Sequence, residues 1–298
     1  MITFRPLTLA DKDTLLPYLR NSNRRNCDVS FSNLYCWRFM FNTVFAEVDD
    51  FLLFKFWING QVSYMLPFGT GNLSEMILQL KRDALDVERS AKFRLSGICP
   101  DQKQLLENLM PQRFSISADR DYNDYLYLRT DLATLTGKKY QPKRNHVNKF
   151  RKTYSYEYRS IDRNLIPECL QMEAEWCRQN NCNGQDGTNN ERQAVINGLT
   201  HFEELGLTGG ALFVDGRIVA FTFGMPISHD TFGVHVEKAD TRIDGAYAMI
   251  NYEFANHVPE AYTYLNREED LGIEGLRKAK LSYHPFLLLE KSVAEWIG

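Results

Sequence analysis

The most informative stretch of the sequence for the fold is residues 211–225, which read ALFVDGRIVAFTFGM. Two β-prone runs flank the Asp215-Gly216 dipeptide, a strong signal for a tight β-hairpin turn. Residues 231–237 form a third β-prone run, and a helix is predicted over 245–258. The sequence therefore predicts an antiparallel hairpin that is extended by another strand and followed by a helix.

The first half of the chain shows the same order of elements. A strand at 2–7 and a helix from Thr8 lead into a second predicted hairpin, whose turn is Asn59-Gly60. The remaining predicted elements of this half are strands at 44–56, 62–68, 93–98 and 125–128, and helices at 33–41, 73–85 and from Pro100. Both halves are therefore predicted to be α/β (α+β), each with a mixed, mostly antiparallel sheet flanked by helices.

Length and charge indicate where the two halves meet. A chain of 298 residues is longer than one hydrophobic core usually holds, so two domains are expected. Residues 138–152 carry seven positive charges and no acid, an abrupt change from the sequence before them. We therefore predict an N-terminal domain at 1–136 and a C-terminal domain at 137–298. The functional site is expected in the second domain.

Composition excludes several classes of protein. The net charge of −3 argues against binding polyanions over the whole surface. The first residues lack a signal-peptide pattern, and no apolar run is long enough to span a bilayer. The six cysteines and six histidines show no metal-ligand spacing, so no metal site is expected. We expect a cytoplasmic protein.

The densest polar cluster is residues 266–270, which follow a predicted strand and read NREED. Ligands gather outside the carboxyl ends of strands in open α/β sheets, so Asn266 and Arg267 are candidate substrate-binding residues. Glu268 or Asp270 would accept the proton of a bound amine. In an extended segment these two carboxylates face one side, and Glu269 faces water or Arg267 on the other. The alternative is a solvated, charged loop.

Side chains on either side of this cluster could assist it. His235 and Glu237 alternate along one predicted strand and would face the same side, as a general base and its orienting partner. Tyr283 could stabilise an oxyanion or protonate a leaving group, and Arg277 and Lys280 share a helical face that could bind substrate. A structural histidine and C-terminal helix charges are the alternatives.

Two further segments could bind phosphate. Residues 242–245 match the first half of an [RQ]-x-x-G-x-[GA] pyrophosphate loop, in which Arg242 and Gly245 would contact the ligand at a helix start. Tyr247 occupies the position of the final small residue. In the basic segment, Lys143, Arg144 and Asn145 could contact phosphate oxygens. An ordinary capped helix and a solvated linker are the alternatives.

Residues 137–149 and, more specifically, residues 264–285 resemble the C-terminal domain of lysyl-phosphatidylglycerol synthases and their soluble relatives. The start, Arg5-Pro6-Leu7-Thr8 with Asp11, is similar to the first strand–helix turn of GCN5-related N-acetyltransferases, or GNAT proteins. The resemblance implies tandem GNAT-like domains, a relationship to Fem transferases, and aminoacyl-tRNA as the acyl donor. It also implies donor phosphates near Lys143, Arg144 and Gly245, and the acceptor near Glu237 and residues 266–270.

These observations predict an acyl or aminoacyl transferase. The donor would be aminoacyl-tRNA or acyl-CoA, the acceptor an amine or hydroxyl on a small molecule or lipid, and no tightly bound cofactor is expected. The alternatives are a non-catalytic module of degenerate GNAT fold that senses a nucleotide, tRNA or anionic lipid, and a structural interaction protein.

Overall fold

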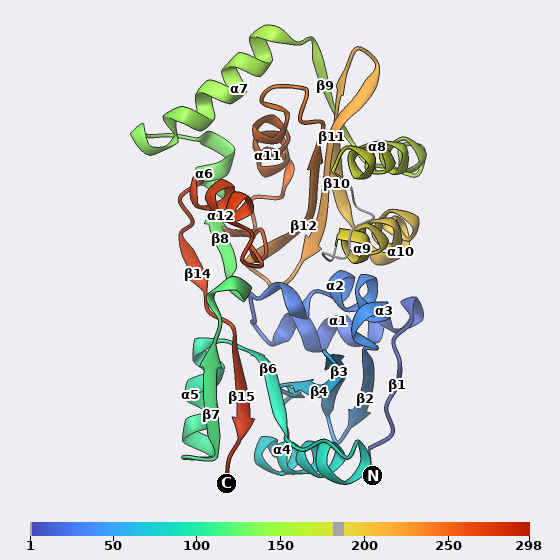
Figure 1. The fold of residues 1–298 in the computed structure, drawn as a ribbon, viewed down its shortest axis with the longest axis vertical. Helices are drawn as coiled ribbons and strands as arrows, with labels where there is room; N and C mark the ends of the chain where they lie inside the picture. Colours follow the sequence, from blue (N-terminus) through green and yellow to red (C-terminus); the bar gives the residue numbers. More distant parts are fainter. Residues whose placement is uncertain (1, 181–187) are drawn as a thin grey trace.

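Two β-sheets, one above the other, form the framework of the molecule (Figure 1). The computed structural model describes residues 2–180 and 188–298. The first sheet has the order β1-β2-β3-β4-β6-β15-β7, with β5 beside β3. Its strands are β1 (Arg5–Pro6), β2 (Val44–Val48), β3 (Phe51–Ile58), β4 (Gln61–Met65), β5 (Phe68–Gly69), β6 (Arg94–Ile98), β7 (Phe114–Ala118) and β15 (Ser292–Trp296).

The second sheet has the order β14-β8-β13-β12-β11-β10-β9. Its strands are β8 (Asp124–Leu128), β9 (Tyr156–Ser160), β10 (Thr208–Val214), β11 (Arg217–Pro226), β12 (Thr231–Ala239), β13 (Tyr264–Asn266) and β14 (Leu287–Leu289). In the described residues, strand pairing is antiparallel except for β4 with β6 and β12 with β13. The expected α/β class with mostly antiparallel sheets is confirmed.

Helices flank both sheets, and one group lies between them (Figure 1). The helices are α1 (Lys12–Asn21), α2 (Phe31–Cys36), α3 (Arg38–Phe41), α4 (Leu73–Arg82), α5 (Pro100–Leu109), α6 (Arg129–Thr134), α7 (Gln141–Thr153), α8 (Ile166–Gln179), α9 (Thr188–Thr200), α10 (Phe202–Leu205), α11 (Ala246–His257) and α12 (Glu274–Leu281). Leu15 and Phe31 of the group between the sheets share one buried apolar cluster with Leu199 and Phe223 of the second half. The two halves therefore share a core.

The predicted hairpin at 211–225 is present as β10 and β11. Asp215 and Gly216 have φ values of 49° and 74°, the left-handed conformation that a two-residue hairpin turn requires. The first-half strand expected at 44–56 is instead two strands, β2 and β3, because Asp49 and Asp50 also adopt positive φ and reverse the chain. The basic segment, for which a solvated linker was the alternative interpretation, is mostly the helix α7, and Val147 and Phe150 bury its apolar side.

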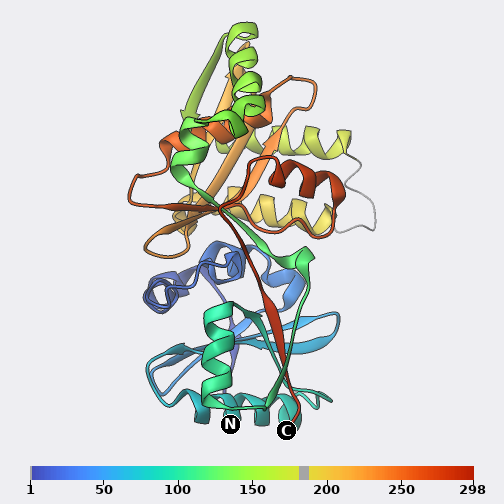
Figure 2. The ribbon, with the colours of Figure 1, turned by 90° about the vertical axis from the view of Figure 1, so that its left-hand side faces the viewer.

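The sheets do not divide at the expected boundary between residues 136 and 137. Strand β8 precedes that boundary but pairs with β13 and β14 of the second sheet. Strand β15 ends the chain but inserts between β6 and β7 of the first sheet. Figure 2 shows the green β7–β8 segment and the red C-terminal segment crossing together between the sheets. Each sheet is thus completed by a strand from the other part of the chain.

No helix among the described residues is long and apolar enough to cross a membrane.

We predict that Gly224→Ala destabilises the fold, because an added Cβ would lie 1.8 Å from the Gly233 carbonyl oxygen on the neighbouring strand. Overpacking of this kind costs about 1–3 kcal/mol in the free energy of unfolding, measured with urea. Gly275→Ala is the control, because no atom lies within 4 Å of its added Cβ and alanine favours a helix. Equal stability of the two variants would contradict the prediction.

Candidate functional site

The parallel strands β12 and β13 separate soon after they meet. They pair only from Thr231 to Gly233 and from Tyr264 to Asn266. After Val234, the register with β11 jumps and leaves His235 as the extra residue of a β-bulge. We call this opening the β12–β13 fork; His235 and Glu237 line it from β12, and Arg267 and Glu268 from the loop after β13. Bulges next to active sites commonly redirect side chains.

One face of the fork is built around Arg267. Its Nη2 donates to Glu237 Oε1 at 2.8 Å, and Glu237 Oε2 accepts from Asn251 of α11 at 3.2 Å. Both side chains of the ion pair are little exposed, at 12% and 13%. Within the part of the chain that the structure describes, Arg267 Nη1 and Asn251 Oδ1 are buried without a hydrogen-bond partner. An unsatisfied buried donor and acceptor are costly unless a ligand or water completes them.

Tyr283 and Lys143 lie beside Arg267. The Arg267 guanidinium is 5.0 Å from the Tyr283 ring centroid, and Lys143 Nζ is 4.0 Å from the same centroid. Burial raises the pKa of Tyr283, so its hydroxyl keeps its proton at neutral pH. Burial, and then the charge of Arg267, lowers the pKa of Lys143. The structure thus brings together three residues predicted from separate motifs.

The predicted pair of His235 and Glu237 does not form. The bulge breaks the alternation, so Glu237 turns toward α11 while His235 turns toward α2. His235 Nδ1 instead lies 2.8 Å from Glu268 Oε1, and Nε2 lies 2.8 Å from the Ser30 hydroxyl. Sequence reasoning missed Ser30, since nothing in its neighbourhood marks a partner 205 residues away.

The expectation of an extended segment at 268–270 is also wrong. Glu268 has a φ of 57°, so the backbone turns and the acidic side chains diverge. Asp270 is completely buried and accepts hydrogen bonds from Arg277, Arg120, the Tyr125 hydroxyl and the Gly272 amide. These partners, Arg277 first, hold the pKa of Asp270 far below its usual range. Such a carboxylate is a fixed anchor and a poor proton acceptor.

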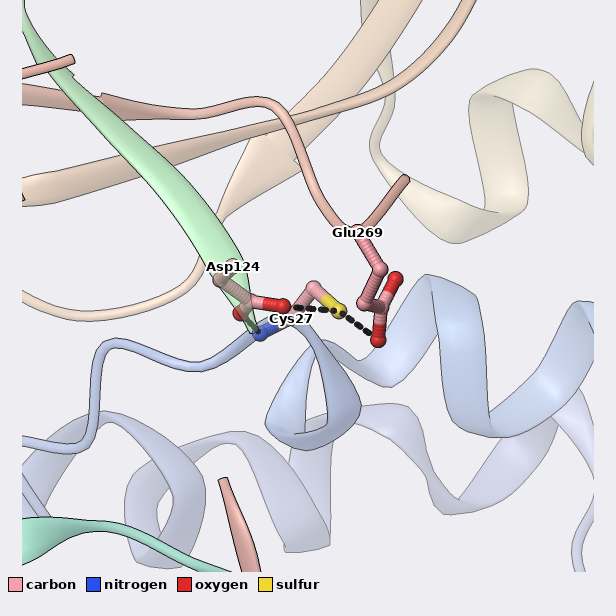
Figure 3. Close-up of side chains that lie close together, drawn as sticks. All are labelled: Cys27, Asp124 and Glu269. Carbon is pink, nitrogen blue, oxygen red and sulfur yellow. Dashed lines mark hydrogen bonds between the residues drawn. The ribbon is translucent and has the colours of Figure 1, made fainter. Parts of the chain in front are cut away.

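Glu269 does not face water but joins a buried cluster around Lys291. Lys291 Nζ contacts the carboxylates of Glu269, Asp124 (2.9 Å) and Asp28 (3.0 Å). Cys27 lies beside them, with its Sγ 3.4 Å from both Asp124 Oδ1 and Glu269 Oε1 (Figure 3). Cys27, Asp124 and Glu269 are close enough to hold a metal ion, but the Lys291 ammonium already supplies the positive charge there.

Charge balance explains the titration of this cluster. Burial raises the pKa of Glu269 to about 7 and also raises the pKa of Asp124. The neighbouring carboxylates add to both shifts, because three acids share one ammonium. Lys291 stays charged, because its carboxylate neighbours raise its pKa against the effect of burial. No local pattern in the sequence predicts that Lys291, near the C-terminus, contacts Asp28 and Asp124.

Asn266 and Lys280 hold the loop at 266–270 through buried hydrogen bonds. Asn266 is fully buried; its Nδ2 donates to Asp124 Oδ2 and to the Arg25 carbonyl, and its Oδ1 accepts from the Glu268 amide. Lys280 is also buried, and its Nζ donates to the Arg267 carbonyl. Both predicted substrate-binding residues therefore already have internal partners.

The predicted phosphate-binding residues are mostly occupied by internal contacts. Arg144 donates to the carbonyls of Leu135 and Gly137 at the start of α7. Arg242 forms a two-point ion pair with Asp240 at 2.7 and 2.9 Å. Gly245 has a φ of 82°, and an added Cβ would approach the His146 carbonyl of α7 to 3.0 Å. Asn145 lies exposed on α7. Of this group, Lys143 alone reaches the fork.

Two hollows of about 480 and 510 Å³ lie on the first sheet, away from the fork. They share Gln61, Val62 and Arg94, and none of the predicted site residues lines them.

Comparison with known proteins places the chain among transferase-related structures. The family model for phosphatidylglycerol lysyltransferase, C-terminal, matches residues 19–295. An uncharacterized protein of Mycoplasmoides gallisepticum is 26% identical over 183 residues, a match that covers 58% of this chain and 56% of that protein. The chain thus spans little more than half the length of this relative.

Several solved structures share the fold. A conserved protein of unknown function from Bacteroides thetaiotaomicron is 60% identical over 100% of both chains, with a TM-score of 0.96. L-PGS from Bacillus licheniformis is 16% identical with a TM-score of 0.64, over 95% of this chain and 91% of that one. FemX is 9% identical with the same TM-score, over 100% and 98%. A tandem GNAT protein from the clavulanic acid pathway, 9% identical over 99% and 98% with a TM-score of 0.50, agrees with the tandem GNAT-like architecture.

We predict that Asp270→Asn lowers the free energy of unfolding by about 1–3 kcal/mol at pH 7, because it weakens several charge-assisted hydrogen bonds. The pKa of Asp270 is lower in the folded protein than its ordinary value of 3.8 in the unfolded chain. Asp270 therefore contributes its full stabilisation of the fold above pH 3.8, and this contribution is lost as the pH falls through the folded pKa. The difference in melting temperature between wild type and variant should therefore shrink below about pH 4. Glu274→Gln, at an exposed acid on α12, is the control. A constant difference down to pH 2 would refute this account.

We predict that Glu269→Gln flattens part of the pH dependence of stability. The pKa of Glu269 is about 7 in the folded protein, above its ordinary value of 4.5. Its protonated form therefore stabilises the fold fully below pH 4.5, and this contribution is lost as the pH rises through 7. Wild type should lose more stability than the variant between pH 5 and 8, measured by urea unfolding. Glu173, whose pKa burial also raises to about 7, should contribute in the same direction. Glu260→Gln is the control because that side chain is 93% exposed; parallel curves for all variants would contradict the prediction.

Proposed function

We propose, from the premise that this chain belongs to the phosphatidylglycerol lysyltransferase C-terminal family, that it transfers an acyl or aminoacyl group at the β12–β13 fork. The observation that carries the proposal is the pair of unsatisfied buried atoms there, the donor Arg267 Nη1 and the acceptor Asn251 Oδ1. A carbonyl oxygen would complete the first and an N–H or O–H group the second. Both groups are present in the reactants of acyl transfer.

The side chains of the fork turn toward both faces of the sheet. Arg267 and Glu237 belong to the face that α11 covers, whereas Glu268 and His235 turn toward α2. A donor and an acceptor entering from opposite faces would meet between Arg267 and Glu268. Holding two reactants in this way supplies much of the rate enhancement in group transfer.

In the proposed reaction, the acceptor amine or hydroxyl attacks the acyl carbonyl carbon. Glu268 takes the proton of the attacking group on Oε2, since the hydrogen bonds that its carboxylate forms with the described residues Asn33 and His235 end on Oε1. Arg267 Nη1 donates to the carbonyl oxygen as negative charge develops. The bond from the acyl carbon to the donor's oxygen or sulfur breaks, and the Tyr283 hydroxyl gives the leaving atom a proton. Glu268 then releases its proton to solvent and the Tyr283 phenolate takes a proton from solvent, so both residues return to their starting states.

The donor class is aminoacyl-tRNA or acyl-CoA, and the acceptor is an amine or hydroxyl on a small molecule or lipid. Helix α7 carries further exposed cations, Lys149, Arg151 and Lys152, and a basic helix next to Lys143 suits a polyanionic donor, which favours aminoacyl-tRNA over acyl-CoA. We keep a cytoplasmic location as part of the proposal.

We predict that Glu268→Gln lowers turnover about 100-fold or more, since a general base commonly contributes that much, while donor affinity changes little. Transfer would be followed with labelled aminoacyl-tRNA and acyl-CoA donors and a panel of amine and hydroxyl acceptors. Glu274→Gln is the matched control on the exposed surface of α12.

Full turnover by Glu268→Gln would remove that residue from the mechanism. Binding of a donor by the wild type without transfer to any acceptor would instead favour the non-catalytic binding module.

A further inference from the structure

A chain of hydrogen bonds links the first half of the molecule to the fork. The Ser30 hydroxyl lies 2.8 Å from His235 Nε2, and His235 Nδ1 lies 2.8 Å from Glu268 Oε1. Asn33 of α2 donates from Nδ2 to the same carboxylate oxygen at 2.8 Å. Ser30 is 1% exposed, the His235 side chain 4% and Glu268 20%, so only the carboxylate end of this chain meets solvent.

The backbone is shaped to hold this chain of hydrogen bonds. His235 is the extra residue of the β12 bulge, and Gly233 leaves room for its ring, because a Cβ there would lie 2.7 Å from His235 Cε1. Glu268 adopts a φ of 57°, which non-glycine residues rarely adopt. Asn266 stabilises this conformation, because its Oδ1 accepts a hydrogen bond of 2.7 Å from the Glu268 backbone N–H. Strained backbone held by several partners is typical of functional sites.

The chemistry of these groups fixes their directions. An ionised carboxylate only accepts, so His235 Nδ1 carries a hydrogen and donates to Glu268. In the neutral imidazole, Nε2 then accepts, and the Ser30 hydroxyl donates to it. Ser30 therefore sets the ring orientation, and His235 and Asn33 together saturate Oε1. Oε2 takes part in neither of these hydrogen bonds and is the oxygen to which the proposed mechanism assigns the proton.

We propose that Ser30, Asn33 and His235 are positioning residues for Glu268, so that helix α2 of the first half completes the active site of the second. This inference rests on the proposed function. It gives the first half a part in the chemistry, although none of the motifs that suggested a site lies in it. The charged and titratable groups near Glu268 besides His235 are Lys280, Glu269 and the Cys36 thiol.

The test compares Ser30→Ala with Ser32→Ala. Both serines are buried at the start of α2, but the Ser32 hydroxyl contacts Cys36 and does not reach His235. We expect Ser30→Ala to lower kcat about tenfold, because a general base contributes about 100-fold or more and a poorly oriented base loses part of that contribution. KM for the donor should stay within about twofold, and the acidic limb of the pH–rate profile should move to higher pH, because the carboxylate is less well held. Ser32→Ala should match wild type in all three.

A readout independent of activity is the proton NMR signal of the His235 ring Nδ1–H, assigned by its absence in His235→Gln. Burial and the bond to Glu268 protect this proton from exchange with water, so it should be visible in wild type and Ser32→Ala and broadened in Ser30→Ala. Asn33→Ala, at a partly exposed residue, provides a second variant should Ser30→Ala fold poorly; Ser30→Thr, which keeps the hydroxyl, should restore activity.

Two results separate the inference from the function on which it rests. The first result is that transfer depends on Glu268, but Ser30→Ala and Asn33→Ala both match wild type in kcat, pH profile and NMR signal. This result would overturn the positioning role and leave the proposed function intact. Absence of transfer in the wild type with every donor would overturn both.

Discussion

A single buried ammonium, Lys291 Nζ, joins the parts of the chain that cross between the two sheets. Its carboxylate partners come from three segments: Asp28 ahead of α2, Asp124 at the start of β8, and Glu269 in the loop after β13. Lys291 itself lies between β14 of the second sheet and β15 of the first. A buried charge of this kind is tolerable only while its partners stay in place, so the cluster fixes how the crossing segments meet.

The loop at 266–270 depends on this junction. Its five side chains each take a different partner: Asn266 binds Asp124, Arg267 binds Glu237, Glu268 binds His235, Glu269 binds Lys291, and Asp270 binds Arg277. The left-handed backbone at Glu268 makes this division possible. Two of the three acids thereby become structural anchors. Glu268 keeps one carboxylate oxygen outside these bonds, which is why the proposed mechanism rests on it.

The two halves act as one structural unit. Helices α1 and α2 contribute to a core that also holds residues of the second half, and β8 and β15 each complete the sheet of the other part. The family model correspondingly spans residues 19–295 and not the second half alone. A site that draws Glu237 and Arg267 from one half and Ser30 and Asn33 from the other is what such a fused architecture provides.

The sequence by itself determined the class of fold, the hairpin at Asp215-Gly216, the family and the location of the polar loop at 266–270. These follow from local signals: turn dipeptides, short-range periodicity and contiguous motifs. Only the tertiary structure decided which carboxylate is available for chemistry, because Lys291, Arg120 and Asn33 reach the loop from 22, 150 and 235 residues away along the chain, respectively. The placement of β8 in the second sheet, the placement of β15 in the first and the bulge at His235 likewise depend on contacts between distant parts of the chain. A local sequence pattern predicts which secondary structure a segment forms. Which distant side chains contact each other depends instead on how the whole molecule packs.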